Sequence, residues 1–131
     1  MHNIWIADDD EAIRLVLEES LSSAGFKTKS FSSGDDLVSE LESSEPDLII
    51  TDVQMPGMLG YDLLKHITNN YEDLPVIVMT AFADMQAAVE SFGGGAFEYM
   101  PKPFDLEDAI KIVERALEEK PKTKGLKKIP N

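Results

Sequence analysis

Polar side chains follow four of the short apolar runs in this sequence, and their chemical types suit phosphoryl transfer. Carboxylates bind hard cations such as Mg²⁺, and an Asp carboxylate can accept a phosphoryl group as an acyl phosphate. An ammonium group and a hydroxyl group can hold the charged phosphoryl oxygens. The candidate residues are Asp8, Asp9 and Asp10 after the run at 4–7, Asp52 after the run at 48–50, Thr80 after the run at 76–79 and Lys102 after the run at 96–100.

Carboxylates that gather at one place repel one another, so a pKa rises unless a cation relieves the repulsion. Mg²⁺ suits such a place, because it prefers one or two carboxylates together with water and phosphate oxygens. Each residue alone also has an ordinary structural explanation, since an aspartate at a strand end is often a turn or cap residue. Asp10 fits that explanation best, as the cap of a helix that opens at Glu11.

The apolar runs are predicted to be strands. Three of them are apolar at consecutive positions, as strands buried on both faces are, whereas the second is more polar and suggests an edge strand. Helical patterns separate the runs, and this (βα)₅ order predicts an α/β fold with a doubly wound, five-stranded parallel sheet. The predicted strands cover 4–7, 26–31, 48–50, 76–79 and 96–100, and the apolar helical patterns cover 13–24, 37–41, 63–67, 85–92 and 106–117, the last two capped by Asp84 and Asp105.

Ligands of doubly wound sheets bind outside the carboxyl ends of the strands. The predicted elements therefore bring the candidate residues to one rim of the sheet, although the first aspartates and Asp52 are far apart in the chain. Four residue types suited to one reaction, all at the same rim, favour the functional interpretation over separate structural roles.

The composition limits the class of protein. The 131 residues fit one domain, and the absence of cysteine excludes disulfides and thiolate metal sites. No apolar run approaches the roughly 20 residues that a membrane helix needs, and the first residues lack the basic start of a signal peptide. We therefore expect a cytoplasmic protein with no membrane attachment.

The charge is unevenly distributed. The chain has 12 basic and 25 acidic residues, a net charge of −13, yet residues 1–119 hold all the acids and only seven of the cations. Residues 1–119 are not expected to bind nucleic acid directly, because phosphate contacts need clustered Lys and Arg. Residues 120–131 carry five lysines and no apolar period, so we predict a domain over 1–119 followed by a basic linker or tail.

Four motifs follow one another along the chain, namely the cluster Asp8-Asp9-Asp10, the stretch Asp52–Gly60, Thr80-Ala81 and Lys102-Pro103-Phe104. In this order they resemble the receiver domain of two-component response regulators, over residues 3–119. The stretches 79–81 and 95–104 are most similar to the nitrogen-regulation (NtrC-like) subgroup, whose members activate sigma-54-dependent transcription. The resemblance implies a flavodoxin-like or CheY-like fold with strand order 2-1-3-4-5, and it favours a cis bond between Lys102 and Pro103.

The resemblance implies a metal site and a phosphoacceptor. Asp52 would take a phosphoryl group from a sensor histidine kinase. Asp9 would be a direct Mg²⁺ ligand and Asp8 a ligand through water, with Asp52 and the backbone carbonyl of Gln54 completing the protein ligands. The pair Asp8/Asp9 follows from the spacing to the arginine five residues after Asp9, and the pair Asp9/Asp10 is the alternative register.

The resemblance also implies a switch and partners. Lys102 and Thr80 would hold the phosphoryl oxygens, and Tyr99 would be the switch residue that follows Thr80. The output face would combine the fifth strand with the last two helices, and it could also support a homodimer. The partners would be the histidine kinase and a C-terminal output domain, AAA+ and DNA-binding, outside this chain. The domain would catalyse only its own phosphotransfer and dephosphorylation, so it would not be an enzyme in the usual sense.

Three alternatives differ in their sequence requirements. An aspartate-nucleophile phosphatase normally has a second Asp two residues after the nucleophile, where this chain has Gln54. A flavodoxin-like redox protein needs a phosphate-binding loop after the first strand, where three aspartates would repel an anion. A receiver fold that serves only for docking would have lost Asp9, Asp52 or Lys102, and all three are present.

Overall fold

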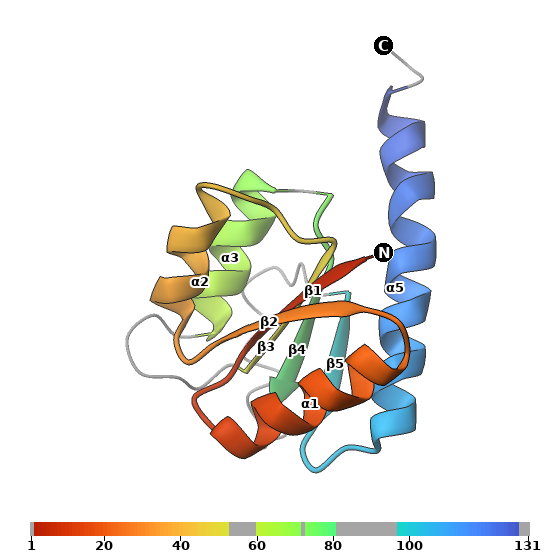
Figure 1. The fold of residues 1–131 in the computed structure, drawn as a ribbon. Helices are drawn as coiled ribbons and strands as arrows, with labels where there is room; N and C mark the ends of the chain where they lie inside the picture. Colours follow the sequence, from red (N-terminus) through yellow and green to blue (C-terminus); the bar gives the residue numbers. More distant parts are fainter. Residues whose placement is uncertain (1, 53–59, 72, 81–96, 129–131) are drawn as a thin grey trace.

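Five parallel strands form one sheet in the order β2-β1-β3-β4-β5, which confirms the predicted fold class and strand order. The computed structural model describes residues 2–52, 60–71, 73–80 and 97–128, and Figure 1 shows the sheet between helices on its two faces. The described elements are β1 (Asn3–Ala7), α1 (Glu11–Ser23), β2 (Lys27–Phe31), α2 (Gly34–Leu41), β3 (Leu48–Asp52), α3 (Gly60–Asn70), β4 (Val76–Thr80), β5 (Glu98–Pro101) and α5 (Leu106–Lys128).

Alternate side chains of the central strands enter two separate cores. On β1, Trp5 and Ala7 pack with the buried side chains of α2 and α3, whereas Ile4 and Ile6 pack with those of α1 and α5. Because both faces are covered, the central strands need apolar residues at consecutive positions. The edge strand β2 instead alternates between exposed and covered residues, as its polar sequence predicts.

The ends of α1 follow from local chemistry. The Asp10 side chain accepts a hydrogen bond from the backbone N–H of Ala12 at 2.9 Å, which makes it the N-cap. After the helix, Gly25 adopts φ +97°, a backbone conformation that residues other than glycine disfavour. The cap at Asp10 was predicted from the sequence.

Two differences from the sequence prediction concern element ends. The strand β3 continues through Thr51 to Asp52, so the candidate acid is the last residue of the strand. The backbone of α5 remains helical to Lys128, whereas the apolar helical pattern predicted from the sequence ends at 117. The predicted helix over 85–92 and its cap Asp84 lie outside the described residues.

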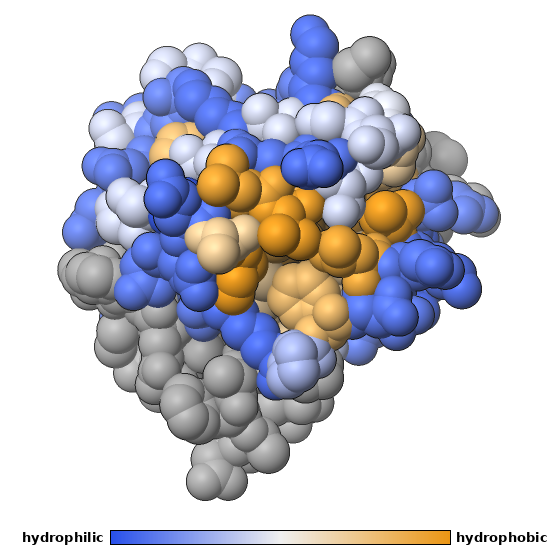
Figure 2. All heavy atoms as spheres, turned by 60° about the horizontal axis from the view of Figure 1, so that its bottom comes forward, coloured by the Kyte–Doolittle hydropathy of each residue, from blue (hydrophilic) through white to orange (hydrophobic). Residues whose placement is uncertain are grey.

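An apolar patch covers the surface beside α1. Figure 2 shows apolar side chains gathered on one face of the molecule. In α1, Leu15 and Val16 are 57% and 46% exposed. A groove of about 520 Å³ is lined by Val16 together with Ile13 and Phe104, with Lys102 at its wall. No described helix is both long enough and apolar enough to cross a membrane.

Candidate functional site

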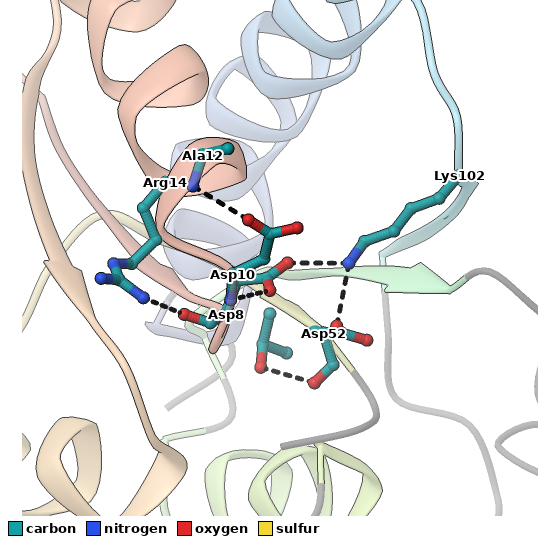
Figure 3. A network of polar contacts seen from close by, with 7 residues as sticks. Asp8, Asp10, Ala12, Arg14, Asp52 and Lys102 are labelled. Atoms are coloured by element: carbon teal, nitrogen blue, oxygen red, sulfur yellow. Dashed lines mark hydrogen bonds and ion pairs between the residues drawn. The ribbon is translucent and has the colours of Figure 1, made fainter. Parts of the chain in front are cut away.

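The parallel register brings two of the predicted acids together at the carboxyl end of the sheet. Ala7 of β1 pairs with Thr51 of β3, so Asp8 and Asp52, the next residues, lie side by side. Lys102 follows β5 and reaches across to both, with its Nζ 2.8 Å from Asp8 Oδ2 and 2.9 Å from Asp52 Oδ2 (Figure 3). The ammonium thus joins residues that are 94 and 50 positions distant in the chain.

Asp8 is held at every polar group. Its side chain is fully buried, and its backbone N–H donates to the carbonyl of Phe31 at 3.1 Å. Its Oδ1 accepts a hydrogen bond from the backbone N–H of Asp10 at 2.8 Å, and its backbone carbonyl accepts one from Arg14 Nη1 at 2.7 Å. Asp8 is therefore the anchor of the loop between β1 and α1.

Exposure distinguishes the acids. The Asp8 side chain is 0% exposed, whereas the Asp52 side chain is 10% exposed and can be reached from solvent. Asp9 is exposed at the surface of the same loop. Asp10 points to the start of α1, where it serves as the cap.

The electrostatics of the site reflect two carboxylates that share one ammonium. Burial raises the pKa of the Asp8 carboxyl above its usual value, although the hydrogen bonds from Lys102 and from the Asp10 backbone oppose that rise. Burial alone would lower the pKa of Lys102, but its hydrogen bonds to Asp52 and Asp8 outweigh that effect and raise it. The Lys102 ammonium is therefore firmly charged.

The donor set fits a divalent cation. Asp8, Asp9 and Asp52 each offer one carboxylate oxygen, and these oxygens lie within 4.8 Å of one another. Hard oxygen donors with a net negative charge are what Mg²⁺ prefers. The group contains Asp8 and Asp9 but not Asp10, which is engaged with α1.

Several predicted site residues are only partly described. The backbone of Thr80 ends β4, but its side chain is outside the description, and Gln54 lies outside the described residues altogether. Tyr99 on β5 is half-buried and packs against the core between the sheet and the pair α2 and α3. The Lys102-Pro103 bond is cis, as the resemblance favoured.

Two contacts of the site were not predicted. Arg14 served in the sequence only as a spacing marker, yet its guanidinium bonds to the Asp8 carbonyl. Thr51 is fully buried, and its hydroxyl donates to the Asp52 carbonyl at 3.0 Å. Side-chain bonds to backbone carbonyls have no periodic pattern, so only the presence of a polar residue beside the motif could have pointed to them.

Comparisons with known proteins agree with this geometry. Residues 4–114 match the family model described as the response regulator receiver domain. The chain is 46% identical over 114 residues to the DNA-binding transcriptional regulator NtrC of Salmonella typhimurium, covering 87% of this chain and 24% of that protein. It is 45% identical over 117 residues to NtrC of Bradyrhizobium sp., again with 24% of that protein covered. The chain thus spans about a quarter of the length of these relatives.

Solved structures show the same fold. The solution structure of the apo receiver domain of nitrogen regulatory protein C has a TM-score of 0.81 and 45% identity, covering 90% of this chain and 95% of that one. The response regulator TrrA of Thermotoga maritima, in complex with Mg²⁺-BeF, has a TM-score of 0.81 and 28% identity, covering 88% and 99%. This chain therefore belongs to the response regulator receiver domain family, within its NtrC-like subgroup.

Proposed function

We propose that this chain is a phosphoacceptor module in which Asp52 takes a phosphoryl group from a sensor histidine kinase. The observation that carries the proposal is the bridge of Lys102 between Asp8 and Asp52, which together with Asp9 form a group of three carboxylates that can hold a cation. Of the two acids that Lys102 contacts, Asp52 is the one that a phosphodonor can reach, because Asp8 is fully buried.

Phosphotransfer at this site would proceed by attack of an Asp52 carboxylate oxygen on the phosphorus of a phosphohistidine. The new O–P bond forms as the P–N bond breaks, and the imidazole leaves with the electron pair of that bond. Lys102, held 2.9 Å from Asp52, is placed to bind the phosphoryl oxygens. Attack of water on the phosphorus later restores the carboxylate and releases phosphate.

Asp8, Asp9 and Asp52 would hold the cation, with the carbonyl of Gln54 as a further ligand that remains a prediction. When bound, Mg²⁺ supplies positive charge beside the transferred phosphoryl group. Asp9 would bind directly and Asp8 through water, and the restriction of the carboxylate group to Asp8, Asp9 and Asp52 supports that register over Asp9/Asp10.

The signal would leave the site through β5 and α5. Lys102 lies between these two elements, so a phosphoryl group on Asp52 that draws on Lys102 pulls on the loop that joins them. Thr80 and Tyr99 would form the switch, and the face with β5 and α5 would carry the output and a homodimer contact. We place the module in the cytoplasm, ahead of AAA+ and DNA-binding domains of a sigma-54-dependent activator.

The proposal is tested by incubating the chain with acetyl phosphate and Mg²⁺ and measuring its intact mass. We expect one added phosphoryl group, which is lost in the Asp52→Asn variant and kept in Asp35→Asn, a control at an exposed acid of α2. Asp9→Asn is expected to need more Mg²⁺ for the same extent of modification. A wild-type chain that stays unmodified at saturating Mg²⁺ would favour a fold that serves only for docking. Equal modification of Asp52→Asn would show that another residue is the acceptor, which would refute the role of Asp52.

A further inference from the structure

The guanidinium of Arg14 bonds to a backbone carbonyl rather than to a carboxylate. Arg14 stands in α1 directly after the three aspartates, yet among the described residues its guanidinium takes part in no salt bridge. Its Nη1 instead donates to the backbone carbonyl of Asp8 at 2.7 Å, and Figure 3 shows the side chain turned back toward the start of the loop. A charged donor forms a stronger bond to a carbonyl than a neutral one does.

The carbonyl that Arg14 holds belongs to the peptide between Asp8 and Asp9. A peptide unit is planar, so fixing its carbonyl also fixes the direction in which the chain enters Asp9. The backbone N–H of Arg14 in turn donates to the Asp10 carbonyl at 3.2 Å, which ties the other end of the loop to α1. The loop is therefore tied on both sides of Asp9, on one side by the Arg14 side chain and on the other by an ordinary backbone bond of the first helical turn.

Asp9 depends on this support more than its neighbours do. The Asp8 carboxylate is bound by Lys102 and by the Asp10 N–H, and the Asp10 carboxylate caps α1. The exposed Asp9 carboxylate has no hydrogen bond or ion pair among the described residues, so its position follows from its backbone. Asp9 nevertheless lies within 4.8 Å of the carboxylate oxygens of Asp8 and Asp52.

We infer that Arg14 is a positioning residue, which holds the Asp8-Asp9 peptide so that Asp9 completes a divalent-cation site with Asp8 and Asp52. The inference rests on the proposed function, since it requires that the three carboxylates bind Mg²⁺. It goes beyond that function by assigning a role to a residue that touches neither the cation nor the phosphoryl group.

The direction in which Mg²⁺ affinity changes when Arg14 is replaced distinguishes a positioning role from simple charge repulsion. A guanidinium near a cation site repels the cation, so removal of its charge alone would strengthen Mg²⁺ binding. Loss of positioning has the opposite effect, because an unsupported ligand weakens the site. Removal of such supporting contacts typically costs 10–100-fold in metal affinity, and we expect roughly a tenfold weakening here.

The experiment is a calorimetric titration of MgCl₂ into Arg14→Met and into a matched control, Arg115→Met. Arg115 on α5 pairs with Glu98 at 2.6 Å and is 53% exposed, so its substitution removes the same charge from the surface. We expect Arg14→Met to raise the Kd for Mg²⁺ about tenfold and Arg115→Met to leave it nearly unchanged. Equal or tighter binding by Arg14→Met would overturn the inference.

Further variants and a second readout keep the test decisive. Arg14→Gln also removes the charge but is too short to reach the carbonyl, so it replaces Arg14→Met should that variant fail to fold. Arg14→Lys, which keeps a charged donor on a long stem, is expected to recover part of the affinity. The second readout is the rate of phosphorylation by acetyl phosphate at different Mg²⁺ concentrations. In Arg14→Met the half-saturating Mg²⁺ concentration should rise, while the rate at saturating Mg²⁺ stays close to that of the wild type. A lower rate at saturating Mg²⁺ with an unchanged half-saturating concentration would refute the positioning role.

The proposed function and the role of Arg14 can be refuted separately. If the wild-type chain takes up no Mg²⁺, the proposed function is wrong and Arg14 has no site to support. If the wild type binds Mg²⁺ and Asp9→Asn weakens that binding but Arg14→Met does not, the proposed function stands and the role of Arg14 is refuted.

Discussion

The substitution Lys102→Met tests whether Lys102 stabilises the site by offsetting two carboxylates. In the wild type its Nζ lies within 2.9 Å of both Asp8 and Asp52, and its side chain is 15% exposed. Methionine keeps the volume of the stem and removes the charge. The buried Asp8 and the largely buried Asp52 would then face each other without the ammonium that separates their charges.

The substitution is expected to lower the free energy of unfolding by a large amount for a single lysine. Removal of one partner from a buried ion pair costs about 3–5 kcal/mol, because an uncompensated charge stays buried. Since Asp52 retains some solvent contact, we expect the lower end, about 3 kcal/mol in Mg²⁺-free buffer. For a domain of this size that corresponds to a fall in Tm of about 10 °C.

The assay is urea denaturation followed by circular dichroism, with Lys29→Met as the matched control. Lys29 pairs with Glu40 at the same 2.8 Å, but these side chains are 51% and 34% exposed, so its loss is expected to cost less than about 1 kcal/mol. The cause is checked by making Lys102→Met in an Asp8→Asn/Asp52→Asn background, where the cost should largely vanish. An equal cost in both backgrounds, or a cost no larger than that of Lys29→Met, would refute the reasoning.

Two further predictions concern the loop after β1. Because burial raises the pKa of Asp8, the folded chain binds the Asp8 proton more tightly than the unfolded chain does. Without Mg²⁺, the stability of the wild type should therefore fall relative to Asp8→Asn as the pH rises from the usual pKa of 3.8 through the raised pKa. Urea midpoints across this pH range measure the difference, and parallel curves for the two chains would contradict the prediction. Asp10→Ala removes the N-cap of α1 and is expected to cost about 1 kcal/mol of unfolding free energy, whereas Asp10→Asn keeps the acceptor and should lose far less.

The sequence predicts the fold well because a parallel sheet covered on both faces has a distinctive pattern. Consecutive apolar residues such as Ile4, Trp5 and Ile6 suit only a strand whose two faces are both buried, and the structure places them in two separate cores. The rim location of Asp8, Asp52 and Lys102 follows from the same topology, since parallel strands end at the same edge.

The sequence does not predict contacts that depend on individual side-chain geometry. No pattern shows that Lys102 bridges Asp8 and Asp52 rather than pointing to solvent, or that Arg14 bonds to a carbonyl in the presence of three carboxylates. The strand end at Asp52 was also missed, because the buried Thr51 satisfies its hydroxyl through a bond to the next carbonyl. Such local compensation lets a polar residue continue a strand that hydropathy alone would end.

Trp5 gives the chain an optical property that follows from its place on β1. It is the single tryptophan, it is 5% exposed, and it packs against Phe31 with ring centroids 5.3 Å apart. Its indole lies in the core on the face of the sheet covered by α2 and α3, three residues before Asp8. Tryptophan fluorescence therefore reports on one known position, and unfolding of this core can be followed without any added label.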